Sequence, residues 1–324
     1  MSKMSIEPSS DSSLRGCSIS GATMGTRYSA RFFAGPISEA LVRAELFAAV
    51  DAVDRQMSTW KPDSDLSRLN AAPVDQWVRV PPELAIVLAE ALRIGRESGG
   101  AFDIAVGDLV NDWGFGPGEP RDHLARLSGL ATSRRYSAAD SIEFDETGEF
   151  VRKRVPVSLD LSGIAKGFGV DELARSLERL GIGSYLVGID GELRARGRKP
   201  NGEVWMAAVE RPDYGRRDAM GVLALSDVSV ATSGDYRHWI EFEGAKLSHT
   251  MNPHLGGPLR NRIASVTVLA DTCMDADAWA TALMVMGEKA GPDFARARGM
   301  DALFVLRETG HLTELGVGKF GSDR

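Results

Sequence analysis

The chain has 324 residues, of which 43% are hydrophobic and 26% charged, and its net charge is −7. These values are typical of a globular protein with a large core, and the acidic balance argues against nucleic acid as a partner. The sequence has no run of about 20 apolar residues, so we expect no membrane span.

Residues 1–20 are polar and rich in serine, and they lack the apolar stretch of a secretory signal. We expect this head to be disordered and residues 21–324 to form a single domain. The compartment stays open, because the protein is either cytoplasmic or exported with its leader removed. Two cysteines, Cys17 and Cys273, are too few for a disulfide framework or a zinc site.

The first third of the chain predicts one strand followed by long helices. Residues 26–33 alternate in polarity like a strand, and residues 38–57 carry apolar side chains at helical spacing. The Pro-Pro pair at 81–82 begins a second helix, which the Gly-Gly pair at 99–100 ends.

The segment SGGAFDIAVGDLVNDWGFG, residues 98–116, predicts a turn, a short apolar strand and an aromatic-rich loop. Trp113 and Phe115 suit either stacking on a planar ring or burial in the core. Taken alone, the segment favours the core.

A glycine-rich stretch, LDLSGIAKGFGVDELA at 159–174, follows a strand and leads into a helix predicted over 171–180. Backbone N–H groups in such a turn bind anions, and Lys166 adds a cation. Both common phosphate-binding signatures are absent, because Glu172 replaces a required glycine and Gly167 a required Ser or Thr. Phosphate binding and a simple tight turn therefore stay open.

From residue 184 to residue 270 the sequence predicts mostly strands, including a hairpin over 237–250. A last hairpin is expected over 302–315. His249 ends a predicted strand and titrates near neutrality, which suits a proton acceptor, although a solvated histidine is the ordinary alternative. Because strands and helices come in runs, the sequence predicts an α+β fold with mainly antiparallel sheets and packed helices.

The segment DADAWATALMVMG, Asp275 to Gly287, predicts a buried helix that Gly287 ends. Asp275 suits the N-cap position. Asp277 and Thr281 are four residues apart and therefore share one helix face. Such an oxygen pair suits a hard cation such as Mg2+, but two residues alone do not decide between a metal site and capping.

Seven segments follow one another between about residues 21 and 290, namely ATMGTRYS, MSTWKPDSDLSRLN, GGAFDIAVGDLVNDWGFG, LDLSGIAKGFGVD, ATSGDY, SHTMNPHLGGP and DADAWATAL. In this order they resemble the ApbE-like FAD:protein FMN transferases. The resemblance implies an ApbE-like fold with two lobes around a central FAD cleft. It also implies a Mg2+-dependent transferase that cleaves FAD, attaches FMN through a phosphoester bond to a Thr or Ser of a partner flavoprotein of an electron-transfer complex, and releases AMP. The alternatives are an FAD pyrophosphatase and a non-catalytic flavin-binding protein.

The resemblance also implies which residues form the site. The metal ligands would be Asp277, Thr281 and the backbone carbonyl of Gly163, and His249 would act with Asp277 in catalysis as the base or orienter near the phosphate. The residues expected to contact FAD are Met24, Trp60, Ala101, Phe102, Asp103, Asp160, Lys166 and Met251.

Two stretches depart from the family's usual pattern. Where the family often has Asn-x-Gly-Gly-Asp, this chain has Gly-Ile-Asp-Gly-Glu, ending in Asp190-Gly191-Glu192. Where the family often has His-x-x-Asp-Pro, Asn252 replaces the acid, which weakens the case for a carboxylate that orients His249. The metal pair and the lysine turn are intact, so we still expect activity.

Overall fold

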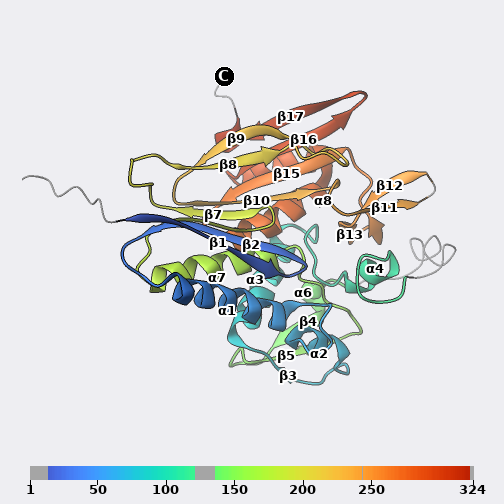
Figure 1. Ribbon diagram of the computed structural model, residues 1–324. Helices are drawn as coiled ribbons and strands as arrows, with labels where there is room; N and C mark the ends of the chain where they lie inside the picture. The colour runs from blue at the N-terminus through green and yellow to red at the C-terminus, as the bar shows by residue number, and fades with distance from the viewer. Residues whose placement is uncertain (1–13, 121–135, 243, 322–324) are drawn as a thin grey trace, which may run out of the picture.

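The computed structural model describes residues 14–120, 136–242 and 244–321. Its largest element is an eight-stranded sheet in which every pair of neighbours runs antiparallel (Figure 1). In spatial order the strands are β1 (Arg15–Thr23), β2 (Thr26–Ala34), β6 (Ser184–Ile189), β7 (Glu192–Arg196), β10 (Val228–Gly234), β15 (Ile263–Ala270), β16 (Asp301–Glu308) and β17 (His311–Val317).

The two faces of the sheet are covered differently. Successive side chains of a strand point to opposite faces. Phe32 and Tyr185 therefore pack toward the helices, while Phe33 and Leu186 pack against the hairpin β8–β9. The covering elements are α1 (Glu39–Met57), α7 (Ala165–Arg179) and α8 (Cys273–Ala297) on one face, and β8 (Trp205–Glu210) and β9 (Ala219–Leu225) on the other.

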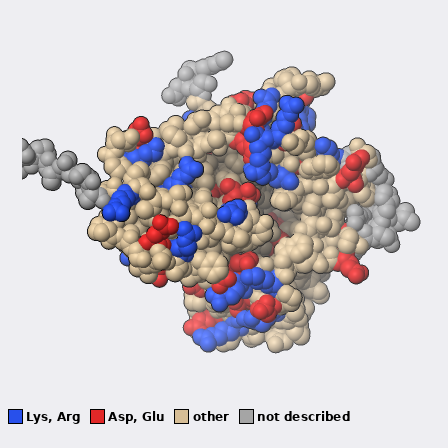
Figure 2. Space-filling view, viewed as in Figure 1, with Lys and Arg blue, Asp and Glu red and all other residues tan. Residues whose placement is uncertain are grey.

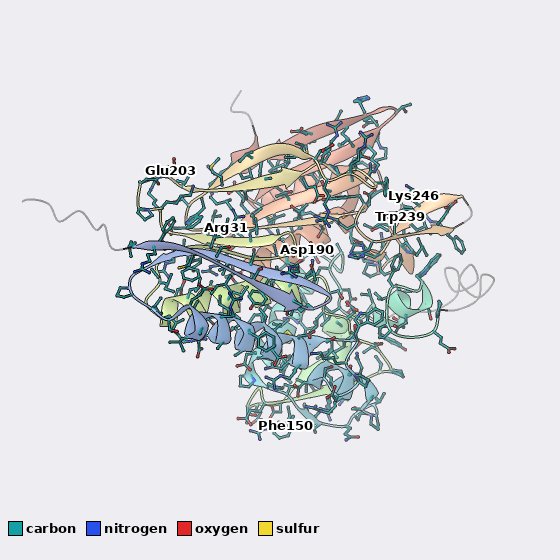
Figure 3. All side chains as sticks on the ribbon, viewed as in Figure 1. Arg31, Phe150, Asp190, Glu203, Trp239 and Lys246 are labelled. Carbon is teal, nitrogen blue, oxygen red and sulfur yellow. The ribbon has the colours of Figure 1, made fainter. Side chains whose placement is uncertain are left out.

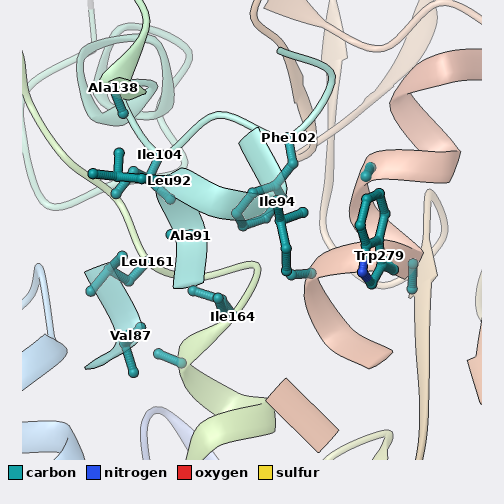
Figure 4. Close-up of a cluster of buried hydrophobic side chains, with 14 of the residues drawn as sticks. Val87, Ala91, Leu92, Ile94, Phe102, Ile104, Ala138, Leu161, Ile164 and Trp279 are labelled. Carbon is teal, nitrogen blue, oxygen red and sulfur yellow. The ribbon is translucent and has the colours of Figure 1, made fainter. Parts of the chain in front are cut away.

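Below the helices, a second part of the chain is built around α3 and a small sheet (Figure 1). Its buried apolar side chains join those of α8 in one cluster, part of which Figure 4 shows around Ile94, Phe102 and Trp279. This continuous core holds α8 against the loop that follows α3. The elements are α2 (Asp65–Ala71), β3 (Val78–Arg79), α3 (Pro82–Glu97), α4 (Gly107–Asp112), α6 (Ala138–Ser141), β4 (Ile142–Phe144) and β5 (Phe150–Lys153).

Short elements complete the described part of the chain. They are β11 (Trp239–Phe242), β12 (Ala245–Ser248), β13 (Met251–Asn252), β14 (Gly257–Pro258) and the 3-10 helix η1 (Gly318–Phe320). No helix within the described ranges is both long and apolar enough to cross a membrane.

The α+β class and the antiparallel sheets are confirmed. The helix predicted over 38–57 is α1, whose N-cap Ser38 accepts a hydrogen bond from the Leu41 N–H. The Pro-Pro pair begins α3, with Pro82 as its first residue. The strand over 26–33 and the closing hairpin are also confirmed, as β2 and β16–β17.

Four predictions need correction. Strand β1 begins at Arg15, so the disordered head does not extend to residue 20; residues 1–13 lie outside the described ranges. Residues 101–106 form no strand and lead into α4. Helix α7 begins at Ala165 rather than at 171, so the glycine-rich stretch forms its first turns. Gly287 (φ 84°) marks a kink inside α8, and the helix continues to Ala297.

Candidate active site

The candidate site lies at one end of the large sheet, where the β1–β2 and β6–β7 turns meet α7 and α8. Met24 and Asp190 occupy these turns with left-handed backbone angles of φ 46° and 52°, and the Asp190 N–H donates to the Arg27 carbonyl across 3.2 Å. Figure 3 shows Asp190 near the middle of the molecule. On the same face, Figure 2 shows a hollow bordered by acidic and basic side chains.

The three residues predicted as metal ligands lie together. Asp277, only 4% exposed, accepts a 2.9 Å hydrogen bond from the Gly167 N–H. One helical turn later, the Thr281 Oγ1 lies 2.9 Å from the Ser233 Oγ. Gly163 is so close to Thr281 that a Cβ on Gly163 would be 3.2 Å from this oxygen. Gly163 therefore lies beside Thr281, one helical turn from Asp277, and the carboxylate, hydroxyl and carbonyl oxygens of these residues are donors of the kind that suits Mg2+.

Within the described ranges, no group of three or more His, Cys, Asp or Glu residues is placed to hold a metal ion. The oxygen donors at Asp277 and Thr281 are the kind that hard cations prefer.

Glycine in the first turn of α7 is explained by the approach of α8. A Cβ on Gly167 would be 2.8 Å from the Asp277 Cβ, closer than real Cβ atoms come. Glycine therefore lets the backbone N–H reach the Asp277 carboxylate directly.

The start of α8 corrects the assignment of Asp275 as N-cap. The N-cap is Thr272, whose hydroxyl oxygen accepts a 3.1 Å hydrogen bond from the Asp275 N–H and donates across 2.8 Å to the Asp275 carboxylate. Asp275 thus belongs to a capping pair. Asp277 points elsewhere, toward α7.

Lys166 lies between the buried carboxylate of Glu192 and the partly exposed carboxylate of Asp190. Its Nζ is 2.7 Å from Glu192 Oε1 and 4.0 Å from Asp190 Oδ2. Burial lowers the pKa of Lys166, but attraction by Glu192 and Asp277 outweighs it, so the net pKa is raised and the ammonium stays charged. Burial, with repulsion from Glu192, raises the pKa of Asp277 to about 7.

A second cation, Arg237, faces the same group of acids. It pairs closely with Glu210, and its Nη1 lies 3.9 Å from Asp190 Oδ1. The cluster therefore contains two cations, Lys166 and Arg237, and four carboxylates. The carboxylates belong to Asp190, Glu192, Glu210 and Asp277.

His249 is half-buried at the end of β12 and is held by the backbone of His238. Its Nδ1 lies 3.1 Å from the His238 carbonyl oxygen, which also accepts the His249 N–H. Burial and repulsion by His238 lower the pKa of His249 to about 4, so the ring is neutral near pH 7. Because a carbonyl only accepts, Nδ1 carries the proton and Nε2 is left as the acceptor.

The hydrogen bond between His249 and the His238 carbonyl explains how the ring is oriented although Asn252 stands where the family often has an acid. The Asn252 side chain accepts hydrogen bonds from the backbone N–H groups of His254 and Leu255, which stabilises the turn after β13. The backbone carbonyl of His238, rather than an acidic side chain, orients the His249 ring.

The residues predicted to contact FAD after α3 lie beside the metal ligands. A Cβ on Gly163 would be 3.3 Å from the Phe102 ring. Phe102 and Asp103 line a cavity of about 370 Å³, large enough for one ring system of a dinucleotide. Asp103 accepts N–H groups of Ala105 and Ala138 and so shapes the wall of this cavity. Ala101 is buried in the neighbouring core.

Asp160 is buried, and burial raises the pKa of its carboxyl group. Its Oδ1 accepts a 2.8 Å hydrogen bond from the Ser162 N–H, while its own N–H donates to the Ile104 carbonyl. Asp160 therefore connects the stretch before α7 to the Phe102 loop.

The side chains of two residues predicted to contact FAD lie outside the site cluster. Trp60 is 66% exposed on the loop after α1. Met251 is 5% exposed and packs in a separate apolar cluster with Trp113 and Phe242. Trp113 is therefore a core residue, as its segment alone favoured.

Sequence reasoning missed Ser233, Arg237, Glu210 and the role of His238. Ser233 lies in ATSGDY, a segment already part of the family resemblance, so a signal was present. Glu210 belongs to no such segment and is brought in only by the strand order and the β8–β9 hairpin.

Comparison with known proteins identifies the family of this chain. The ApbE family model matches residues 24–304. The FAD:protein FMN transferases of Haemophilus influenzae and Vibrio cholerae are 38% and 37% identical to the chain, over 92% and 89% of its length and 88% and 87% of theirs. The solved flavin transferase ApbE from Vibrio cholerae superposes with a TM-score of 0.84 at 34% identity, covering 95% of this chain and 98% of that one. The chain belongs to the ApbE family.

Proposed function

We propose that this protein uses Mg2+ to cleave the diphosphate of FAD and transfers FMN to a Thr or Ser hydroxyl of a partner flavoprotein in an electron-transfer complex, releasing AMP. The observation that carries this proposal is the convergence of Asp277, Thr281 and Gly163 beside Lys166. The curated relatives named above are FAD:protein FMN transferases.

The charge balance supports a divalent cation. With Asp277 ionised, four carboxylates and two cations leave the cluster with an excess of two negative charges. A diphosphate would be repelled by such a cluster. Bound Mg2+ would neutralise this excess and the charge that develops on the phosphate oxygens.

The protein side chains have separable roles. Asp277, Thr281 and the Gly163 carbonyl would hold the metal. The Lys166 ammonium, kept charged by its acidic neighbours, would stabilise negative charge on the diphosphate. The neutral His249 would accept the proton of the incoming hydroxyl at Nε2, because its Nδ1–H is occupied by the His238 carbonyl.

One ring system of FAD would occupy the 370 Å³ cavity beside Phe102. This cavity is too small for the entire dinucleotide, so the diphosphate and the other ring system would lie outside it. Phe102, which lines the cavity, packs against Gly163 at the proposed metal site.

The test is to incubate the protein with FAD, with Mg2+ or with EDTA, and with a flavoprotein whose FMN is attached to a threonine, prepared without its flavin. We expect a mass gain of one FMN on that threonine and release of AMP in Mg2+ only. Free FMN without a mass gain would support the pyrophosphatase alternative. Bound FAD without AMP in any metal would support the non-catalytic alternative.

A further inference from the structure

Asp190 occupies an unusual position in the β6–β7 turn. Its φ of 52° is in the left-handed region, which favours glycine, and Asp is one of the few other residues that tolerate it. The turn places its carboxylate at the candidate site, 30% exposed. An acid at a strained position in an anion-binding site calls for an explanation.

Asp190 lies midway between two cations without binding either closely. Its two oxygens are 4.0 Å from the Lys166 Nζ and 3.9 Å from the Arg237 Nη1. Both distances exceed those of a hydrogen bond. Asp190 is therefore attracted to the two cations but does not determine their positions.

The positions of the two cations are determined by other acids. Lys166 donates to Glu192, and Arg237 pairs with Glu210. The side chain of Glu192 is only 3% exposed, and the second carboxylate oxygen of each glutamate is buried with no hydrogen-bond partner among the described residues. Two anchored cations thus face each other across the Asp190 carboxylate.

We propose that Arg237 joins Lys166 in binding the diphosphate of FAD, and that Asp190 is the internal counter-ion that the diphosphate displaces. This inference rests on the proposed function, since it names the anion that the two cations bind. A diphosphate has more charge and more acceptor oxygens than one carboxylate, so it binds both cations more closely. Asp190 then weakens FAD binding and lies between the two cations until the diphosphate takes its place.

The first experiment compares Asp190→Asn and Asp190→Gly with the wild type. Asn keeps the shape and tolerates the left-handed backbone, while Gly also removes the strain. We expect both variants to bind FAD on the order of tenfold more tightly in Mg2+. Each removes the negative charge of Asp190, which lies about 4 Å from the two cations and competes with the diphosphate for them. Binding of riboflavin, which has no phosphate, stays unchanged. Rapid-mixing flavin fluorescence measures the binding of FAD and of riboflavin before turnover begins.

Asp75 supplies the matched control. It also has a left-handed backbone (φ 64°) and pairs with one arginine, Arg154, at 3.2 Å, but it belongs to the β3–β5 part of the molecule. Asp75→Asn and Asp75→Gly are expected to leave FAD binding unchanged. Equal effects at positions 75 and 190 would overturn the inference, as would unchanged or weaker FAD binding in Asp190→Asn.

The second experiment removes the new cation. Arg237→Gln is expected to bind FAD at least tenfold more weakly, with riboflavin unchanged, and Arg237→Lys to retain part of the affinity. The control is Arg262→Gln, since Arg262 likewise pairs with two acids, Glu288 and Glu308. If Arg237→Gln does not fold, Arg237→Lys and the two Asp190 variants decide the outcome.

The two levels of inference fail differently. A wild-type protein that binds no FAD, or never releases AMP, overturns the proposed function. A wild-type protein that transfers FMN, combined with Arg237→Gln that binds FAD normally, overturns only the assignment of Arg237 and Asp190.

Discussion

Two ionic clusters lie on either side of the start of α8, and they differ in exposure and in charge balance. In the first, Arg93 pairs with Glu90 and Glu97 and reaches Asp275 at 3.3 Å, and Arg298 also pairs with Glu97. These side chains are partly exposed, and each acid has an arginine within reach. In the second, the site cluster, Glu192 and Asp277 are almost fully buried, and four carboxylates face two cations.

The contrast explains why two aspartates only two residues apart have different roles. Two residues advance a helix by about 200°, so Asp275 and Asp277 point to nearly opposite sides. Burial raises the pKa of both carboxyls, to about 6 for Asp275 and about 7 for Asp277. Asp275 is compensated by the Thr272 hydroxyl and by Arg93, whereas Asp277 accepts one backbone N–H, and repulsion by Glu192 outweighs attraction by Lys166. An uncompensated carboxylate is what a metal site requires.

The largest expected effect comes from breaking the site cluster at its metal ligand. Asp277→Ala should reduce Mg2+-dependent FAD turnover by at least a hundredfold, about 3 kcal/mol of transition-state stabilisation, without unfolding the protein. Asp277→Asn is the better matched change, because its amide oxygen still accepts the Gly167 N–H. Steady-state AMP release and thermal melting measure the two effects. Full activity in either variant would remove the metal assignment.

The second prediction concerns the neutral base beside the site cluster. His249→Gln should lower the transfer rate about a hundredfold and leave the Mg2+ dissociation constant unchanged. Because the pKa of His249 is lowered to about 4, the ring is already deprotonated at pH 5. At saturating Mg2+ the wild-type rate should therefore stay flat from pH 8 down to pH 5, whereas a base with an ordinary histidine pKa would lose rate below about 6.5.

The third prediction uses the raised pKa of Asp277. Below about pH 7 the metal-free carboxyl holds a proton that Mg2+ must displace, so the apparent Mg2+ affinity should fall about tenfold per pH unit below 7 and stay level above it. The folded protein holds this proton more tightly than the unfolded chain, whose pKa is 3.8. Metal-free stability should therefore decrease as pH rises from about 4 to 7, and Asp277→Asn should remove the part of this decrease that Asp277 contributes.

The contrast between the clusters also marks what the sequence could predict. Asp277 and Thr281 share a helix face by spacing alone, and Lys166 stands in a recognisable stretch. The charge excess could not be predicted, because Glu210 and Arg237 come from distant segments that only the strand order and the β8–β9 hairpin bring together. The orientation of His249 likewise depends on the backbone around the β11–β12 hairpin.

The wrong predictions of secondary structure have equally local causes. Glycines near the start of α7 predicted a turn, but Gly167 is needed so that α7 can approach Asp277 on α8, and tertiary packing outweighs the low helix propensity of glycine. Strand β1 escaped notice because Arg15–Ser20 contain one buried apolar residue, Ile19. Pairing with β2 stabilises this segment despite its composition.

The smallest expected effect comes from breaking the first ionic cluster, around Arg93. Asp275→Ala removes the acceptor of the Thr272 hydroxyl and one partner of Arg93, and it should cost about 1 kcal/mol of stability. Asp275→Asn should cost less, since its amide oxygen still accepts from Thr272. Neither change should alter the Mg2+ dependence of turnover, because Asp275 points away from the site cluster. A loss of Mg2+-dependent turnover in Asp275→Ala, with the fold intact, would exchange the roles assigned to the two aspartates.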